Sequence, residues 1–555
     1  MAHSKTDVII VGAGPTGLMM ASLLARCGVH FRILDHCKDQ VHESRAFGVH
    51  AKSLELFQNI GLVDKVLDRG TLGLGVQFIL NGMNIANVNF DDFGEKDTPY
   101  PFALLLPQSE TENILVEDLN EHGIKIERGV EVTSVRQNGN EVQINILDRH
   151  GAHQQLKTSY LVGADGAHSI VRRSLGLEFN GGPYLQNFLL ADCEVSWPWD
   201  FQHPKFFIRG RSFALYFPLQ GKRLGRIITV LPNISTELDQ GPAKSVTAFQ
   251  PVSLKEVEEG ICQASGVKVK LSNAVWTARY RVHHRMVNQY SVGRVFLAGD
   301  AAHIHSPVGA QGMNTGLQDA ANLAWKLALV IQGRATPKLL DTYDLERRPI
   351  GQKLLDTTDR LFARFSPPSF FATLYRNAVL PILPYLLARS PKLRKRMFHF
   401  LSGLGIHYRG NDFLMGHQAG KRAPNASITE NFNLFTLLQD YQFHVLALAR
   451  RPLTSQEIHH TVKELSSLPK NIGIPIQAHF IGHRLGEHDP RMIDALSTEI
   501  FTRYGVDNPE GTALFLIRPD GHIAFHAPGL EFQRLKIFLS RFQTTRFMRH
   551  PKKAA

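Results

Sequence analysis

The first 35 residues switch between two hydrophobic patterns. Val8 to Val11 is an unbroken β-branched run, which is typical of a strand buried on both faces of a parallel sheet. The apolar positions from Leu18 to Ala25 then predict a helix that ends near Gly28, and residues 29–34 predict a second strand. We therefore expect a strand, a helix and a strand to open an α/β fold.

Three glycines mark the turn between this first strand and the helix. Gly12 permits a tight turn, Gly14 lets the backbone approach a pyrophosphate, and Gly17 lets the helix pack closely on the strand. The helix N-terminus attracts phosphate charge, and Asp35 at the end of the second strand can accept hydrogen bonds from a ribose. A glycine turn without a ligand is the alternative, and the complete strand-helix-strand context disfavours it. The expected dinucleotide-binding residues are Gly12, Ala13, Gly14, Pro15, Thr16, Gly17 and Asp35.

Two later segments also predict a strand that ends in a carboxylate-bearing turn. The first ends in the pair Asp165-Gly166, and the second, residues 295–298, leads to Gly299 and Asp300. A Pro/Gly loop follows, and then apolar residues recur at helical spacing: Leu317, Ala321, Ala324, Leu327 and Ile331.

The middle of the chain, residues 181–280, carries alternating and aromatic runs. Phe206 to Ile208 and Phe213 to Pro218 predict strands of a sheet that covers the cofactor and forms the roof of a substrate pocket. Arg211 and Tyr216 could hydrogen-bond a phenol or a carboxylate, although single polar residues in a strand are more often structural. The candidate substrate-binding residues are Arg211, Tyr216 and Phe217.

Composition narrows the class of protein. A chain of 555 residues predicts two or three domains, and 43% hydrophobic with 20% charged residues is ordinary for a globular protein. The net charge of +12 is scattered along the chain, which favours anionic cofactors and substrates over nucleic acid. The four cysteines form no C-x-x-C pair, and the chain runs straight into its first strand without an apolar signal segment, so we expect a cytoplasmic protein.

One apolar segment, residues 378–388, could be read as a membrane-associated element. Residues 378–388 are apolar but interrupted by Pro381 and Pro384, and they are too short to span a bilayer. A basic stretch at 389–396 follows, so the whole segment 378–396 predicts either a buried helical connection or a peripheral membrane contact. Integral membrane association is not expected.

Taken in order, the G-x-G-x-x-G, D-G and G-D segments make residues 5–360 resemble the class A flavoprotein monooxygenases, the single-component aromatic hydroxylases. The most specific part is the stretch from Gly299 to Asn322. The resemblance implies that Asp300 binds the ribitol chain of FAD and that Asp165-Gly166 touches both FAD and the nicotinamide. It also implies that Arg45 and Gln108 contact the flavin nucleotide. The cofactor-binding residues added in this way are Arg45, Gln108, Asp165, Gly166, Gly299, Asp300, Pro307, Gly312, Met313 and Asn314.

The chemistry of that family implies a helix start, Gly312 to Asn314, that stabilises the anionic reduced flavin. Oxygen then adds at flavin C4a, and the hydroperoxide transfers its distal oxygen to an electron-rich ring while water is excluded. The catalytic candidates are Pro307, Gly309, His50 and Tyr216. His303 and His305 could be taken for a metal pair, but no carboxylate or cysteine cluster accompanies them, so we expect no metal.

No second fingerprint follows the first, so NADPH or NADH is expected as a transient electron donor bound against the same domain. The sequence departs from the family at two places. Phe47 stands where phenol hydroxylases often carry an acid, and the loop 306–310 differs from the usual P-P-x-G-G. The leading hypothesis is hydroxylation of a phenolic or polycyclic aromatic substrate by O2. Oxygenation or epoxidation of a non-phenolic polyketide or antibiotic is the alternative, and a non-catalytic flavoprotein redox sensor is a third.

The last part of the chain resembles the thioredoxin-like C-terminal domain of phenol and polyketide hydroxylases. It contains no cysteine, so scaffolding or subunit contact, for example in a homodimer, is expected instead of thiol chemistry. The expected fold is α/β, with a Rossmann-type FAD-binding domain (1–180 and 281–360), an inserted substrate-binding sheet (70–106 and 181–280), a helical bridge (361–408) and a thioredoxin-like domain (409–555).

Overall fold

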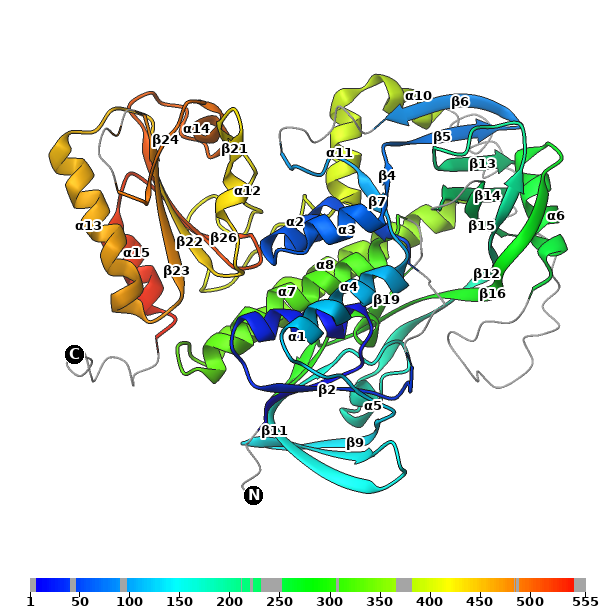
Figure 1. Ribbon diagram of the computed structural model, residues 1–555, viewed down its shortest axis with the longest axis horizontal. Helices are drawn as coiled ribbons and strands as arrows, with labels where there is room; N and C mark the ends of the chain where they lie inside the picture. The colour runs from blue at the N-terminus through cyan, green and yellow to red at the C-terminus, as the bar shows by residue number, and fades with distance from the viewer. Residues whose placement is uncertain are drawn as a thin grey trace.

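The computed structural model describes residues 6–39, 46–89, 97–210, 212–219, 223–230, 252–305, 309–365, 382–483, 485 and 489–543. Figure 1 shows a first sheet at the bottom of the view, a second sheet at the right and a C-terminal domain at the left, with α7 and α8 between them. Helix α2 (Ala51–Asn59) lies beside α7, and α3 (Val63–Arg69) adjoins α2.

The first sheet has the order β17-β18-β11-β1-β2-β8, with β9 and β10 attached to β11. The pairs β1·β2, β1·β11 and β11·β18 are parallel, and Val8, Ile9 and Ile10 are completely buried, so the predicted buried strand is confirmed. The strands are β1 (Thr6–Val11), β2 (Phe31–Asp35), β8 (Glu127–Arg128), β9 (Glu131–Asn138), β10 (Glu141–Leu147), β11 (His153–Gly163), β17 (Ser291–Val292) and β18 (Val295–Leu297). The helices of this domain are α1 (Pro15–Arg26), α4 (Gln108–Glu121), α5 (Ile170–Ser174), α7 (Gln311–Ile331) and α8 (Lys338–Phe365).

The second sheet has the order β19-β16-β12-β15-β14-β13-β5-β6 and carries helix α6 (Leu254–Ser265) on one face. Its two long strands, β12 (Phe179–Ser196) and β16 (Lys270–Val287), run side by side from the first domain into this sheet. The other strands are β5 (Gly75–Leu80), β6 (Met83–Asn89), β13 (Lys205–Arg209), β14 (Ser212–Pro218), β15 (Leu224–Val230) and β19 (His303–Ile304). A small third sheet joins β3 (Gly48–Val49), β7 (Ala103–Leu105) and β4 (Thr71–Gly73).

Two short helices, α10 (Ile382–Arg389) and α11 (Pro391–Leu401), lead from α8 to the C-terminal domain. Residues 378–381 of the apolar segment lie outside the described residues, and the peripheral membrane contact stays a prediction. Among the described helices, none is both long enough and apolar enough to cross a bilayer.

The C-terminal domain is a five-stranded mixed sheet in the order β24-β23-β22-β25-β26, with helices on both faces. On one face α13 and α15 pack against alternate residues of β22 and β25, and on the other face α12 and α14 do so. The elements are β20 (Ser427–Thr429), β21 (Phe432–Asn433), α12 (Leu434–Leu437), β22 (Phe443–Ala449), α13 (Ser455–Ile472), β23 (Ile476–Gly482), β24 (Met492–Asp494), α14 (Glu499–Arg503), β25 (Thr512–Ile517), β26 (Ile523–Pro528) and α15 (Phe532–Ser540).

Four buried histidines make this domain sensitive to acid. Burial lowers the pKa of His444 to about 3 and the pKa values of His479, His522 and His526 to about 4. Because these folded-state pKa values lie below the unfolded value of about 6.5, the unfolded chain binds more protons between pH 4 and 6.5, and stability must fall as pH decreases through that window. For one such histidine the loss between pH 7.5 and pH 5 is on the order of 2 kcal/mol.

We therefore expect the unfolding transition of the C-terminal domain to occur at lower urea concentration at pH 5 than at pH 7.5. The fluorescence of Trp325, whose ring lies 5.3 Å from the Phe443 ring of this domain, followed during unfolding at both pH values measures it. A transition midpoint that does not move between the two pH values would show that these rings already carry protons in the folded state.

Candidate active site

The glycine turn between β1 and α1 has the shape of a phosphate cradle. A Cβ atom on Gly12 would lie 2.3 Å from the Ala164 carbonyl oxygen, and one on Gly17 would lie 1.9 Å from the Gly12 oxygen. A Cβ atom on Gly14, by contrast, would meet no atom within 4 Å. Gly14 is the N-cap of α1, and no side chain caps the N–H groups of its first turn, where Pro15 stands. Open space therefore borders a helix N-terminus, and this arrangement fits the pyrophosphate of a dinucleotide.

Asp35 holds this turn from the end of β2. Its carboxylate accepts hydrogen bonds from the N–H groups of Ala13 and Cys37, each at 2.9 Å, and lies 3.7 Å from Arg128 Nη1. Asp35, His36 and Cys37 are the one group of three potential metal ligands within the described part of the chain. Because backbone N–H groups already occupy the Asp35 carboxylate, we assign it to the glycine turn. Its contact with a ribose stays a prediction.

Gly299 and Asp300 form a short 3-10 turn, η2 (Gly299–Ala301), directly after β18. Gly299 has a φ of +60°, and a Cβ atom there would lie 2.5 Å from Thr16 Oγ1 of α1, so only glycine fits. Asp300 is exposed, whereas Gly299 and Ala301 on either side are buried. The turn thus lies against α1, with Asp300 exposed at its centre.

A buried ion network supports this turn. The Asp319 carboxylate of α7 accepts a hydrogen bond from Gly299 N–H at 3.1 Å, lies 2.8 Å from His303 Nε2, and accepts from Arg347 Nε at 2.7 Å. Burial alone would raise the pKa of Asp319, but Arg347 and His303 outweigh burial and lower it, so the carboxylate is charged. His303 therefore pairs with Asp319 and stacks on His305 with ring centroids 6.1 Å apart.

The loop before α7 is held by side chains from two directions. Asn314 Nδ2 donates to the carbonyl oxygens of Gly48 and Ala310, each at 2.8 Å, and Asn314 Oδ1 accepts from His50 N–H at 2.9 Å. His50 Nε2 donates to the Gly309 oxygen at 2.7 Å. Burial lowers the pKa of His50, so the ring is neutral at pH 7. The contact shows His50 fixing the position of this loop.

Helix α11 reaches the same loop, which the sequence did not reveal. Gln311 Nε2 donates to the oxygens of Phe400 at 3.1 Å and Leu401 at 3.2 Å. A Cβ atom on Gly309 would lie 3.0 Å from Leu401 Cδ2. No motif marks residues 400 and 401, so only the packing of the bridge could place them here.

The Asp-Gly turn and Gln108 complete the predicted cofactor residues. The Asp165 Cα would lie 3.0 Å from a Cβ on Gly12, so this turn adjoins the glycine turn. Burial raises the pKa of Asp165, although its carboxylate accepts from Ser169 Oγ at 2.5 Å. Gly166 has a φ of +73°.

Gln108 Nε2 donates to Glu112 at 2.8 Å. Arg45, Arg211 and Pro307 lie outside the described residues, and their roles stay predictions.

The second sheet separates two of the predicted substrate residues. Tyr216 is completely buried on the α6 face, where its ring lies 4.5 Å from the Trp197 ring and its hydroxyl donates to the Phe201 oxygen at 3.3 Å. Its neighbour Phe217 points to the opposite face, where its ring lies 4.2 Å from Phe47. Because adjacent residues of a strand point to opposite faces, Tyr216 and Phe217 cannot both line one pocket, and the expected substrate and catalytic roles of the two stay predictions.

The Phe47 face of the sheet also holds a buried ion pair. Arg226 donates to the Asp192 carboxylate at 2.8 and 2.7 Å, and Trp276 Nε1 donates to the same carboxylate at 2.8 Å. The Arg226 guanidinium lies 5.3 Å from the centre of the Phe47 ring and 5.9 Å from that of Trp276. Arg226 and Asp192 were missed in the sequence. The signal for Arg226 was a single charge within the otherwise largely apolar strand β15, whereas β12 carries Glu194 beside Asp192 and gave no such signal.

The comparisons with known proteins agree with this geometry. Residues 5–358 match the FAD binding domain family. The chain is 34% identical to 6-methylpretetramide 4-monooxygenase of Streptomyces rimosus, covering 93% of this chain and 90% of that protein. It is 30% identical to pentachlorophenol 4-monooxygenase of Sphingobium chlorophenolicum, covering 93% of each.

Among solved structures, the anhydrotetracycline hydroxylase of Streptomyces rimosus superposes with a TM-score of 0.72 at 28% identity, covering 97% of this chain and 98% of that one. The expected α/β architecture and the FAD cofactor are thereby confirmed. The chain belongs to the FAD-dependent monooxygenases of class A, the single-component aromatic and polyketide hydroxylases that use NAD(P)H as electron donor.

Proposed function

We propose that this enzyme hydroxylates a polycyclic or phenolic aromatic compound bound against the Phe47 face of the second sheet. The observation that carries the proposal is the clustering of Phe47, Phe217 and Trp276 around the Arg226 guanidinium. Aromatic faces beside a fixed cation suit a planar, electron-rich ring. The related enzymes named for 6-methylpretetramide and pentachlorophenol support both a polycyclic and a simple phenolic substrate.

FAD, when bound, supplies the activation of O2 with electrons from NADPH or NADH. The residues of this chain would hold it in place: the N-terminus of α1 and Asp35 would bind the nucleotide, and Asp300 would bind the ribitol chain. Ala310 is the N-cap of α7 and no side chain caps this helix start, so its N–H groups and positive dipole stabilise negative charge on the ring. His50 and Leu401 contact Gly309 and so fix the described end of the loop before α7.

Arg226 offers a way to activate a phenol without an acidic residue at position 47. Its Nη1 atom is buried and finds no hydrogen-bond partner among the described residues. A guanidinium close to the ring stabilises the phenolate and so lowers the pKa of the substrate itself. Position 47 carries Phe where phenol hydroxylases often carry an acid. This difference also favours the second candidate, oxygenation of a non-phenolic polyketide or antibiotic.

The test is NAD(P)H oxidation and product analysis with a panel of phenols, polycyclic phenols and their O-methylated forms. We expect a polycyclic phenol to accelerate NAD(P)H oxidation and to gain one oxygen atom. For that compound, Phe217→Ala should raise KM about tenfold, because about 1.4 kcal/mol of ring contact is removed.

Tyr216→Phe is the matched control, since Tyr216 lies on the other face of the same strand and its substitution should leave KM unchanged. If only O-methylated compounds are oxygenated, the non-phenolic candidate holds. If no aromatic compound accelerates NAD(P)H oxidation, the proposed function is excluded.

A further inference from the structure

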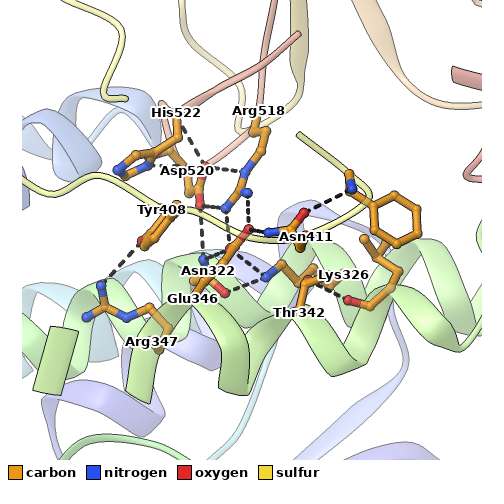
Figure 2. A network of polar contacts seen from close by, with 12 residues as sticks. Asn322, Lys326, Thr342, Glu346, Arg347, Tyr408, Asn411, Arg518, Asp520 and His522 are labelled. Carbon is orange, nitrogen blue, oxygen red and sulfur yellow. Dashed lines mark hydrogen bonds and ion pairs between the residues drawn. The ribbon is translucent and has the colours of Figure 1, made fainter. Parts of the chain in front are cut away.

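The turn between β25 and β26 carries three buried polar residues into the junction of α7 and α8, as Figure 2 shows. Arg518 and His522 are 2% exposed and Asp520 is 6% exposed. Arg518 donates to both oxygens of Glu346 on α8, at 2.7 and 2.9 Å. Lys326 Nζ of α7 lies 2.9 Å from the same carboxylate. The C-terminal domain is thus joined to both helices by charged contacts.

The charges of this cluster are balanced. Three cations meet three carboxylates, and the six residues are Lys326, Arg347, Arg518, Asp319, Glu346 and Asp520. Burial would raise the pKa of Glu346, but Arg518 and Lys326 outweigh burial and lower it to about 2, so the carboxylate is ionised. Removing one member of such a cluster leaves an uncompensated buried charge, so the members hold one another in fixed positions.

A second contact leads from the C-terminal side directly to Arg347. Arg347 Nη1 donates to Tyr408 Oη at 3.3 Å, and the Tyr408 ring lies 4.3 Å from the His522 ring. The Arg518 guanidinium lies 5.1 Å from the centre of the Tyr408 ring. Tyr408 is therefore packed by the β25–β26 turn on one side and hydrogen-bonded to Arg347 on the other.

Arg347 in turn holds Asp319, whose other oxygen accepts from Gly299 N–H. A continuous set of contacts thus joins the C-terminal domain to the Gly299–Asp300 turn. Arg518 and His522 pack on Tyr408. Tyr408 contacts Arg347, and Arg347 contacts Asp319. Glu346 precedes Arg347 on α8, so the Arg518 contact also fixes the helix that carries Arg347.

We propose that the C-terminal domain positions the FAD-binding turn, with Tyr408 and Arg518 as positioning residues that act on Gly299–Asp300 through Arg347 and Asp319. This inference rests on the FAD contact proposed for Asp300. It gives the cysteine-free domain a task in cofactor binding beyond scaffolding. By thermodynamic reciprocity, FAD binding must also stabilise the β25–β26 turn.

The first experiment measures FAD affinity by fluorescence titration of the apoprotein. Tyr408→Phe removes a single hydroxyl, and Arg518→Lys keeps the charge but not the two-pronged contact with Glu346. We expect each to raise the FAD Kd by about fivefold or more and to shift the absorption spectrum of bound FAD. The matched control is Tyr504→Phe. Tyr504 is a buried tyrosine of the C-terminal domain, and its hydroxyl donates to the Pro424 oxygen at 3.0 Å.

The second experiment uses the unchanged protein. Hydrogen exchange of residues 514–526 is measured with and without saturating FAD, and we expect FAD to slow it. The proposal is overturned if Tyr408→Phe binds FAD as tightly as Tyr504→Phe, or if FAD leaves exchange at 514–526 unchanged. Tight FAD binding by Asp300→Ala would instead refute the role of Asp300, because that variant leaves Tyr408 and Arg518 intact.

Discussion

Asp300→Ala is expected to yield a protein that purifies almost free of FAD. The substitution removes the carboxylate of the exposed residue in the η2 turn, and losing a charge-assisted hydrogen bond of this kind weakens binding by about 10- to 100-fold. The FAD to protein ratio from absorbance, followed by titration with added FAD, measures the effect. Because Asp300 is exposed, the free energy of unfolding of the apoprotein should change by less than about 0.5 kcal/mol.

Asp300→Asn is the informative companion, since it keeps an oxygen that accepts a hydrogen bond from a ribitol hydroxyl. It should bind FAD with an affinity between those of the wild type and Asp300→Ala. A yellow, fully loaded Asp300→Ala protein would contradict the role proposed for this carboxylate.

Asp319→Asn is expected to give the largest loss of stability. Asp319 is fully buried between Arg347 and His303, and the neutral amide leaves the Arg347 cation uncompensated. Breaking a buried ion pair from one side costs about 3–5 kcal/mol. Chemical unfolding of the apoprotein measures this cost. The variant should also lose FAD, because Asp319 accepts the hydrogen bond that orients Gly299.

The control is Asp412→Asn, which breaks an ion pair with Lys338 whose two side chains are 68% and 69% exposed. Exposed pairs contribute about 0–1 kcal/mol, so this variant should unfold almost as the wild type does. Equal losses for Asp319→Asn and Asp412→Asn would mean that breaking the buried ion pair costs no more than breaking an exposed one.

The Arg226–Asp192 pair and the Asp319 cluster are two groups of buried charges that differ in whether every donor has a partner. Arg226 is paired with Asp192 on the face of the second sheet assigned to the substrate, and it retains an unused donor in the described structure. The Asp319 cluster has its charges matched and connects separate domains. The first arrangement suits recognition of a ligand, whereas the second suits fixed geometry.

Some features of this protein follow from the sequence alone because their causes are local. The steric need for glycine at position 17 arises from the backbone oxygen of Gly12 in the same turn, and the β-branched run 8–11 predicts a strand buried on both faces. The helical spacing from Leu317 onward likewise predicted α7. Alternation along β14 further required Tyr216 and Phe217 to point to opposite faces, so both could not contact one substrate.

Which of those two side chains lies under α6 was decided by tertiary structure, because it depends on where that helix packs. The same holds for the contact of Leu401 with Gly309, 92 positions earlier in the chain, and for the ion pair of Arg518 with Glu346, 172 positions apart. Such contacts depend on how whole domains pack, and no local pattern of residues encodes that packing. The sequence therefore determined that this chain binds a dinucleotide and belongs with the flavin hydroxylases, whereas only the folded structure connected its C-terminal domain to the flavin site.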